Sequence, residues 1–233
     1  MCDLIVVLFF KGMVGVSFQL VFFGVLLFAP VGSLSWSHAM SWLIIYAAMA
    51  FLSCAFLAFF RPNALEARMR AGRKSQPRAD RLAFGYLVGA LCVSFILPGL
   101  DVHYWSVFPV AGEMVRNTGL LVFVLGYILV LLAMLGNEFA APTVHIQADA
   151  GHILADGGVY RLVRHPMYLG FLLFSVGSML WLGSYISAIL SMVMIILAVI
   201  YRIKVEEVFL VENLPGYEDY RARVKTRFLP LIY

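Results

Sequence analysis

The stretch Gly157–Gly170 (GGVYRLVRHPMYLG) sets a polar, basic and turn-rich segment directly before a long apolar run. Pro166 suits the first turn of a helix, where its missing N–H loses no partner, and it disfavours a helical conformation in the residue before it. We therefore predict a helix start at Pro166, with free N–H groups that suit an anionic ligand group. The polar-tipped Tyr160, His165 and Tyr168 gather at the same place. Taken alone, these residues favour a plainer interpretation, a membrane-interface anchor whose arginines face lipid phosphate.

The composition outside this stretch indicates an integral membrane protein. The chain has 233 residues, of which 63% are hydrophobic and only 13% are charged, whereas a soluble domain carries about 25% charged residues. Its three cysteines, Cys2, Cys54 and Cys92, lie far apart. They form neither a disulfide framework nor a metal-binding pattern, so we expect them to serve as small packing residues.

Hydropathy predicts an all-α membrane protein with about six spans. The first four lie at about residues 4–29, 40–60, 82–100 and 117–136. Trp36 and Trp42 are expected to anchor the second span at the membrane interface. Residues 167–201 then hold no charge, and Gly183-Ser184 stands near their middle. This run is too long for one span, which predicts a tight hairpin of two helices of about 17 residues each.

The placement of the charges predicts the orientation of these spans. The polar loop 61–81 holds seven Lys or Arg against Glu66 and Asp80. The positive-inside rule explains such a loop without any nucleic-acid partner, whereas the segment 101–116 has almost no basic excess and should lie outside. Both termini are then expected on the cytoplasmic side, with every Lys and Arg except Arg116. We expect the membrane to be an inner (cytoplasmic) membrane.

Two polar segments fall on the same side of the membrane in this layout. The connector 137–165 and the tail 202–233 flank the hairpin and can meet. A connector of this length usually has a function. Arg202 and Glu206 end the last span four residues apart, on one helix face. They form either an ordinary surface pair or a cation and a carboxylate that face the region Tyr160–Tyr168, and spacing alone does not choose between these.

Several common kinds of site find no support. His145, His152 and His165 match no zinc or haem spacing, so no metal is predicted. No nucleophile elbow, Rossmann glycine pattern or P-loop is present. A non-enzymatic transporter of ions or small molecules ranks last, because Lys11 is the one charge found within a span.

The order of the motifs in the C-terminal half is more specific than any single one of them. The run GVYRLVRHPMYLG is followed by the apolar hairpin, by RIKVEEVFL at 202–210 and by PGYEDY at 215–220. In this order the chain resembles the isoprenylcysteine carboxyl methyltransferase family and, more loosely, a wider group that includes phospholipid N-methyltransferases. The resemblance covers about residue 137 to the C-terminus. It implies a catalytic region at 137–233 that follows membrane-embedded helices at 1–136.

The resemblance also implies an S-adenosylmethionine site, built from the connector and the ends of the hairpin. Carried over position by position, the cofactor-binding residues are Gln147, His152, Ile153, Leu154, Ala155, Tyr160, His165, Pro166, Met167, Tyr168 and Glu206. Arg202 matches the position that binds the acceptor, in family members its carboxylate, and Arg202 and Glu206 are the candidate catalytic residues. The expected acceptor is a lipophilic small molecule, a lipid or a lipidated chain end, with an isoprenylcysteine-like carboxyl group favoured.

Methyl transfer of this kind needs alignment more than acid–base chemistry. It is an in-line displacement in which charge is neutralised, so positioning in a water-poor site can supply most of the acceleration. A carboxylate acceptor is already ionised at neutral pH, whereas an amine or thiol would need a base, for which His165 or Glu206 is nearest. A sterol-reductase-like enzyme that binds NADPH is the main alternative, because its C-terminal half is similar.

Overall fold

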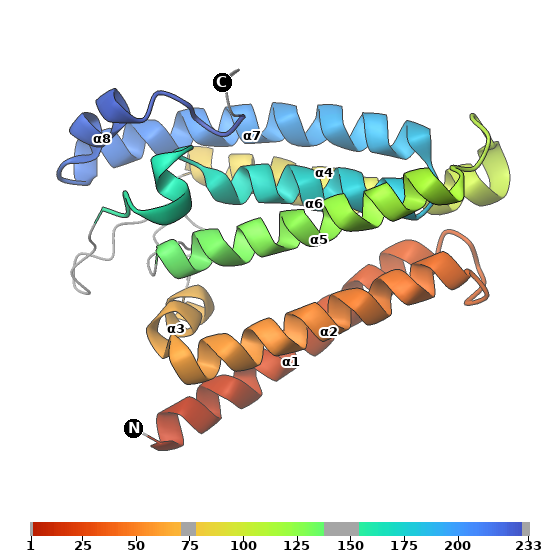
Figure 1. The fold of residues 1–233 in the computed structure, drawn as a ribbon, viewed down its shortest axis with the longest axis horizontal. Helices are drawn as coiled ribbons and strands as arrows, with labels where there is room; N and C mark the ends of the chain where they lie inside the picture. The colour runs from red at the N-terminus through yellow and green to blue at the C-terminus, as the bar shows by residue number, and fades with distance from the viewer. Residues whose placement is uncertain (1, 71–77, 138–153, 230–233) are drawn as a thin grey trace.

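The computed structural model describes residues 2–70, 78–137 and 154–229, and within these ranges it contains helices and no strand (Figure 1). The elements are α1 (Cys2–Phe28), α2 (Ser37–Phe60), α3 (Pro62–Arg70), α4 (Arg78–Leu100), the π-helical turn η2 (Asp101–Trp105), α5 (Glu113–Gly136), the 3-10 turn η4 (Gly158–Arg161), α6 (Pro166–Trp181), α7 (Tyr185–Asn213) and α8 (Tyr217–Arg223). Five of the described helices, α1, α2, α4, α5 and α7, are long and apolar enough to cross a membrane. The remaining predicted span corresponds to α6, a shorter apolar helix of 16 residues. The predicted all-α membrane fold is confirmed.

The predicted hairpin is present, with one arm longer than expected. Gly183 adopts a φ of +96° in the turn, a conformation that favours glycine, and the Ser184 side chain caps α7 by accepting a hydrogen bond from the Ser187 N–H at 3.1 Å. Helix α7 then continues to Asn213 instead of ending near Tyr201. The polar residues after Tyr201 mark the expected membrane boundary, but no helix breaker stands before Pro215.

Two of the expected loops are also partly helical. The segment 61–81 contains α3 and the first residues of α4, because Pro62 at the first position of α3 is compatible with a helix start. At the other end of α4, the chain continues into η2, and α5 begins at Glu113, four residues before the predicted start. The predicted polar loops are therefore shorter than expected.

Helices α5 and α6 pack at unusually close range. A Cβ placed on Gly126 of α5 would overlap with the backbone N of Phe174, and one placed on Gly177 of α6 would overlap with the backbone N of Phe123. Small residues at such a crossing allow two helix backbones to touch inside a membrane, where close packing supplies much of the association. This contact fixes α6, and with it the segment before Pro166.

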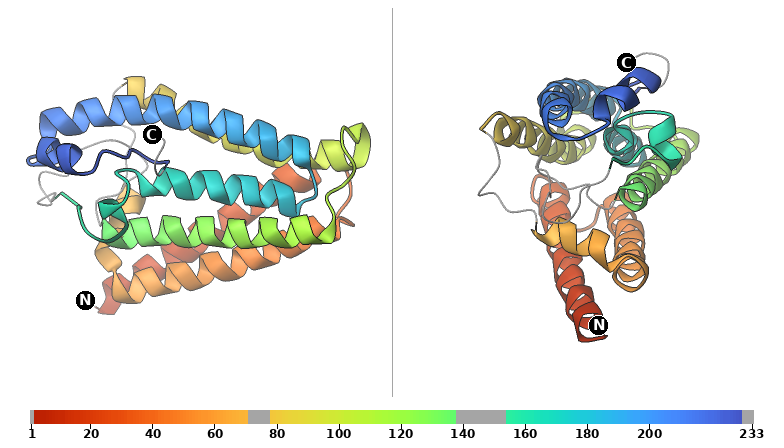
Figure 2. Two further views of the ribbon diagram at one scale, coloured as in Figure 1. Left: turned by 45° about the horizontal axis from the view of Figure 1, so that its top comes forward. Right: turned by 90° about the vertical axis from the view of Figure 1, so that its left-hand side faces the viewer.

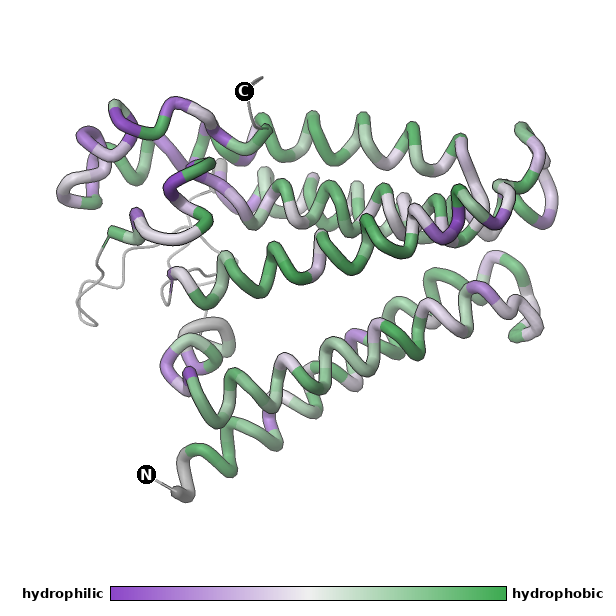
Figure 3. Tube along the Cα trace, viewed as in Figure 1, coloured by the Kyte–Doolittle hydropathy of each residue, from purple (hydrophilic) through white to green (hydrophobic). Residues whose placement is uncertain are grey.

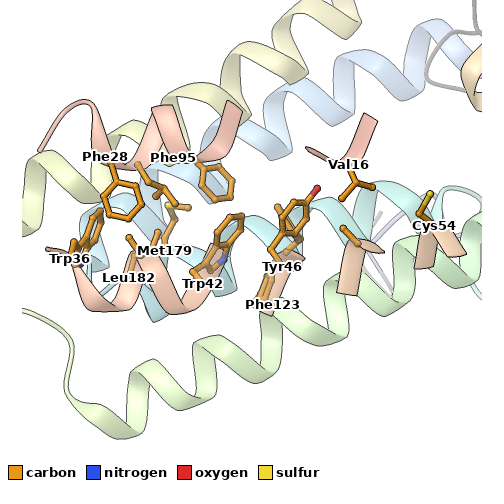
Figure 4. Packing of buried hydrophobic residues seen from close by; sticks show 14 of the residues in the cluster. Val16, Phe28, Trp36, Trp42, Tyr46, Cys54, Phe95, Phe123, Met179 and Leu182 are labelled. Atoms are coloured by element: carbon orange, nitrogen blue, oxygen red, sulfur yellow. The ribbon is translucent and has the colours of Figure 1, made fainter. Parts of the chain in front are cut away.

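Aromatic side chains join the N-terminal helices to the rest of the molecule (Figure 4). Trp42 of α2 is fully buried, packs against Phe95 and Phe123, and donates from Nε1 to the Ser178 hydroxyl of α6 at 2.9 Å. The expectation that Trp42 is an interface anchor is therefore wrong, and Trp36 is buried as well. A buried indole is stable here because its N–H has a partner on another helix.

The polar parts of the molecule gather at one end. The start of α1, together with α3, η4 and α8, lies at the same end of the helices (Figures 1 and 2), and the hydrophilic residues concentrate there (Figure 3). The pair α1–α2 diverges from the other helices towards this end (Figure 1). Residues far apart in the sequence are thereby brought together beside the start of α6.

Candidate functional site

The connector and the tail meet, as the sequence predicts. The backbone N–H of Arg164 donates to the Thr226 carbonyl at 3.0 Å, and that of His165 donates to the Arg227 carbonyl at 2.8 Å. The chain leading into α6 is therefore tied to the segment after α8. The polar residues of α7 lie against this junction.

Tyr168 joins Arg202 to Glu206. Its hydroxyl donates to Glu206 Oε2 at 2.5 Å and accepts from Arg202 Nε at 3.0 Å. Arg202 is 3% exposed, whereas the side chain of Glu206 keeps 22% of its surface accessible. The interpretation of these two residues as an ordinary surface pair is wrong, because both face Tyr168 on α6. We call these three residues the Arg202–Tyr168–Glu206 cluster.

Asp80 belongs to the same cluster of charges, although no role was predicted for it from the sequence. Its carboxylate forms an ion pair with Arg202 Nη1, which also donates to the Asp80 carbonyl at 3.2 Å. Asp80 is 1% exposed and lies in the first turn of α4, where the helix dipole favours a negative charge. One signal could have identified it, since an acid at the edge of an apolar span needs a buried partner.

Glu207 holds a second, separate set of partners. Its carboxylate accepts from Arg164 Nε at 2.7 Å and from Arg227 Nε at 3.2 Å, and it lies 3.3 Å from His165 Nε2. Arg164 is 6% exposed and also donates from Nη1 to the Val224 carbonyl at 2.6 Å. The interpretation that this arginine faces lipid phosphate is therefore wrong. Glu207 joins α7, the start of α6 and the tail.

Most of the predicted cofactor residues that the structure describes line this junction. His165 stacks on Tyr168 with ring centroids 5.7 Å apart, and its Nδ1 lies 3.9 Å from Glu206 Oε2. Pro166 is the first residue of α6, as predicted, and no side chain caps this helix start. The residues that pack around the buried Tyr160 include Leu154, Ala155 and Met167. Gln147, His152 and Ile153 lie outside the described residues.

Three tyrosines are buried beside this junction. Tyr160 donates to the Ala133 carbonyl at 3.1 Å, and Tyr220 donates to the Tyr160 carbonyl at 2.7 Å. The hydroxyl of Tyr217 is buried and has no hydrogen-bond partner among the described residues. Tyr217 and Tyr220 belong to the motif PGYEDY, but no role was predicted for them.

A cavity of about 470 Å³ lies between α1, α2, α3, α4, α5 and α6. We call it the interhelix cavity. Its lining is mostly apolar, with Phe23, Tyr46 and Phe174 among the aromatic members. Phe171 also lines it, and its ring centroid is 6.5 Å from that of Tyr168. Phe171 therefore connects the wall of the cavity to the Arg202–Tyr168–Glu206 cluster.

Within the described ranges, no group of three or more His, Cys, Asp or Glu side chains is placed to hold a metal ion. The chemistry that the described residues can offer is that of a buried guanidinium, a partly exposed carboxylate, stacked aromatic rings and an uncapped helix start. Such a set suits a ligand that carries both an anionic and a cationic group.

Comparison with known proteins places these features in a family. A family model described as phospholipid methyltransferase matches residues 115–215. Over 145 residues, the chain is 33% identical to a protein from Oryza sativa subsp. japonica described as probable protein-S-isoprenylcysteine O-methyltransferase, and the match covers 61% of this chain and 70% of the relative. The chain belongs to the isoprenylcysteine carboxyl methyltransferase family.

Other members of the isoprenylcysteine carboxyl methyltransferase family match over a shorter part of their length. Protein-S-isoprenylcysteine O-methyltransferase A from Arabidopsis thaliana is 36% identical over 117 residues, which is 49% of this chain and 54% of the relative. The Saccharomyces cerevisiae protein-S-isoprenylcysteine O-methyltransferase is 30% identical over 141 residues, which is 59% of this chain and 57% of the relative. The chain thus spans little more than half the length of these two relatives.

The family model matches one side of the junction and ends before the segment after α8 that forms the other side. Residues 115–215 include most of α5, all of α6 and α7, and the segment between α5 and α6. Asp80 and the residues of α1 and α2 that line the interhelix cavity fall outside the match. The matched range contains Tyr168, Arg202 and Glu206.

Proposed function

We propose that this protein transfers a methyl group from S-adenosylmethionine to the carboxyl group of a lipophilic, isoprenylcysteine-like acceptor at the membrane. The observation that carries the proposal is the Arg202–Tyr168–Glu206 cluster, which lies between α6 and α7 and is joined to α4 through Asp80. It presents a fixed cation and an accessible carboxylate side by side. The proposed catalytic region is residues 137–233, after membrane-embedded helices at 1–136.

The described residues fit the proposed cofactor. Glu206 keeps accessible carboxylate surface, which can accept hydrogen bonds from an ammonium group or from ribose hydroxyls. The uncapped first turn of α6 can bind a carboxylate. The rings of His165 and Tyr168 can pack against adenine and the cationic sulfur region. S-adenosylmethionine supplies an activated methyl group when bound, and Gln147, His152 and Ile153 complete the proposed binding set.

Arg202 is the proposed binding group for the acceptor carboxylate. Tyr168 and Asp80 hold its guanidinium, so its position is set before any acceptor binds. A carboxylate nucleophile is ionised at neutral pH, so no side chain has to remove a proton from it. Arg202 is 3% exposed, and a water-poor site around it would favour the displacement. If the acceptor were an amine or a thiol, His165 or Glu206 would be the nearest base.

The interhelix cavity supports a lipophilic acceptor. Binding cavities for small molecules typically have volumes of about 300–1,000 Å³ and mostly apolar walls, and this cavity has both properties. Phe171 links it to Tyr168, so an apolar chain in the cavity would leave its polar end near the Arg202–Tyr168–Glu206 cluster. We propose that the site opens on the cytoplasmic side of an inner membrane, where the positive-inside rule places the basic end of the molecule.

Calorimetry of the detergent-purified protein with S-adenosylhomocysteine, run beside NADPH, tests the cofactor. We expect S-adenosylhomocysteine to bind and the Glu206→Ala variant to lose about 1.5–3 kcal/mol of binding free energy, the range for a hydrogen bond to a charged group. Glu212→Ala, which removes an exposed carboxylate from the same helix, is the control and should bind as the wild type does. Binding of NADPH alone would favour the reductase alternative, and binding of neither ligand would contradict the proposal.

A further inference from the structure

Tyr217 is held in place by the turn that ends α7. Gly216 adopts a φ of +79°, which lets the chain reverse after Pro215 and start α8 at Tyr217. The side chain of Tyr217 is 3% exposed and packs in a group of buried residues with Tyr160 and Tyr220. Its ring therefore has little freedom to move to solvent.

The hydroxyl of Tyr217 differs from those of its two neighbours. Tyr160 and Tyr220 each donate to a backbone carbonyl, at 3.1 Å and 2.7 Å. Tyr217 Oη has no such partner among the described residues, although the atom is buried. Buried polar atoms in native proteins nearly always have a hydrogen-bond partner, so an exception calls for a specific explanation.

The surroundings of this hydroxyl keep its proton in place. Burial raises the pKa of Tyr217, and the nearby carboxylates of Glu207 and Glu206 raise it further. The phenol is therefore neutral at physiological pH and can donate a hydrogen bond. Glu207 already accepts from Arg164 and Arg227, and Glu206 accepts from Tyr168.

The ring of Tyr217 adjoins the residues proposed to hold the cofactor. Leu154, Ala155, Tyr160 and Met167 all belong to the same packed group. A ligand bound at this junction would contact several of these residues at once. A polar atom of that ligand could pair with the Tyr217 hydroxyl, which has no partner among the described residues.

We infer that Tyr217 Oη donates a hydrogen bond to an oxygen of the bound nucleoside cofactor, in its ribose or its amino-acid carboxylate, and that Tyr217 is a cofactor-binding residue. The inference rests on the proposed function and adds a residue to its site. It also gives the unpaired hydroxyl a physical role, because a group that is unfavourable in the free protein becomes favourable when the ligand binds.

The experiment compares Tyr217→Phe with the wild type in two measurements. Titration calorimetry with S-adenosylhomocysteine should show a dissociation constant raised about tenfold, the effect of losing one hydrogen bond. The melting temperature of the ligand-free variant should be unchanged or higher, because the removed hydroxyl has no partner in the part of the chain that the structure describes. Tyr220→Phe, which removes a hydrogen bond to a carbonyl, should instead lower the melting temperature.

Tyr104→Phe is the matched control, since Tyr104 donates to the Val31 carbonyl in a different part of the fold. The dissociation constant of S-adenosylhomocysteine for this variant should equal that for the wild type. An unchanged dissociation constant in Tyr217→Phe, with normal binding by the wild type, would overturn the inference and leave the proposed function standing. A melting temperature lowered as much as in Tyr220→Phe would also overturn it, because the hydroxyl would then be paired within the protein. Failure of the wild type to bind would instead remove the proposed function.

Discussion

Arg202 lies between carboxylates that come from two different helices. Asp80 on α4 forms an ion pair with it, and Tyr168 on α6 connects it to Glu206 on α7. A buried guanidinium is stable only when it is paired, and removal of one member of a buried pair leaves the other charge unsatisfied. Arg202 therefore has a structural role in addition to the role proposed for it in binding the acceptor.

This double role determines how Arg202 should be tested. Arg202→Ala should abolish turnover while the dissociation constant of S-adenosylhomocysteine changes less than about threefold. It should also destabilise the fold by about 3–5 kcal/mol, because Asp80 stays buried without its cation. The double variant Asp80→Asn/Arg202→Gln should recover much of that stability and remain inactive. Thermal unfolding, calorimetry and methyl-transfer rates measure the three quantities, and loss of cofactor binding in the stable double variant would contradict the assignment.

At the residue scale, the sequence predicted one half of the site better than the other. The helix start at Pro166 follows from the backbone chemistry of proline, and it is confirmed. The partner of Arg202 could not be predicted, because Asp80 lies 122 residues away and spacing says nothing about which helices become neighbours. Glu207 was missed as the residue that joins α6, α7 and the tail, because two adjacent glutamates look alike in a sequence while their side chains face different partners.

At the scale of elements, the close contact of α5 and α6 supports the site. Gly126→Ala should lower stability by about 1–3 kcal/mol, because the added methyl overlaps with the backbone of α6. Gly89→Ala is the control, since a Cβ there meets no atom within 4 Å and alanine favours a helix over glycine by about 0.5–1 kcal/mol. Thermal unfolding in detergent compares the two, and equal melting temperatures would show that the contact is loose.

The interhelix cavity can be filled without disturbing the cofactor site. Gly15 of α1 lines it, and a Cβ placed there meets no atom within 4 Å. Gly15→Leu should therefore fold normally, keep its affinity for S-adenosylhomocysteine, and raise KM for a long-chain acceptor by about tenfold, equivalent to about 1.4 kcal/mol of lost chain binding.

Gly89→Leu, on α4 and outside the cavity lining, is the matched variant for kinetics. It should leave KM unchanged. If Gly15→Leu and Gly89→Leu gave the same KM as the wild type, the apolar chain of the acceptor would have to bind elsewhere.

The helices show where hydropathy predicts well and where it does not. The four N-terminal spans and the turn at Gly183-Ser184 coincide with the predicted regions, although each of the four helices begins two to four residues earlier than predicted. Apolar length and turn residues are local signals. The length of α7 was underestimated, because a helix can leave the membrane without ending. The burial of Trp42 was also missed, since an indole suits a membrane interface and a helix contact equally well from sequence alone.

At the scale of the whole molecule, the orientation in the membrane is the open prediction. Asn63 is exposed on α3, and Met114 is 81% exposed near the start of α5, at the opposite ends of the spans that connect them. A cysteine introduced as Asn63→Cys should react with an impermeant maleimide only from the cytoplasmic side. The Met114→Cys variant should react only from the other side, and the reversed pattern would place the site outside the cell.

The proposed acceptor atom is a carboxylate oxygen. The most direct measurement gives the purified protein S-adenosylmethionine labelled in its methyl group together with N-acetyl-S-farnesylcysteine, and then treats the product with base. A methyl ester is cleaved by base and releases labelled methanol, whereas a methylated amine or thioether is not. We predict that the lipid product carries the label and that base releases this label as methanol. The Arg202→Ala variant should form no labelled product. A base-stable product, or label transferred equally well to N-acetylcysteine without its lipid, would show that this protein is not a carboxyl methyltransferase for lipophilic acceptors.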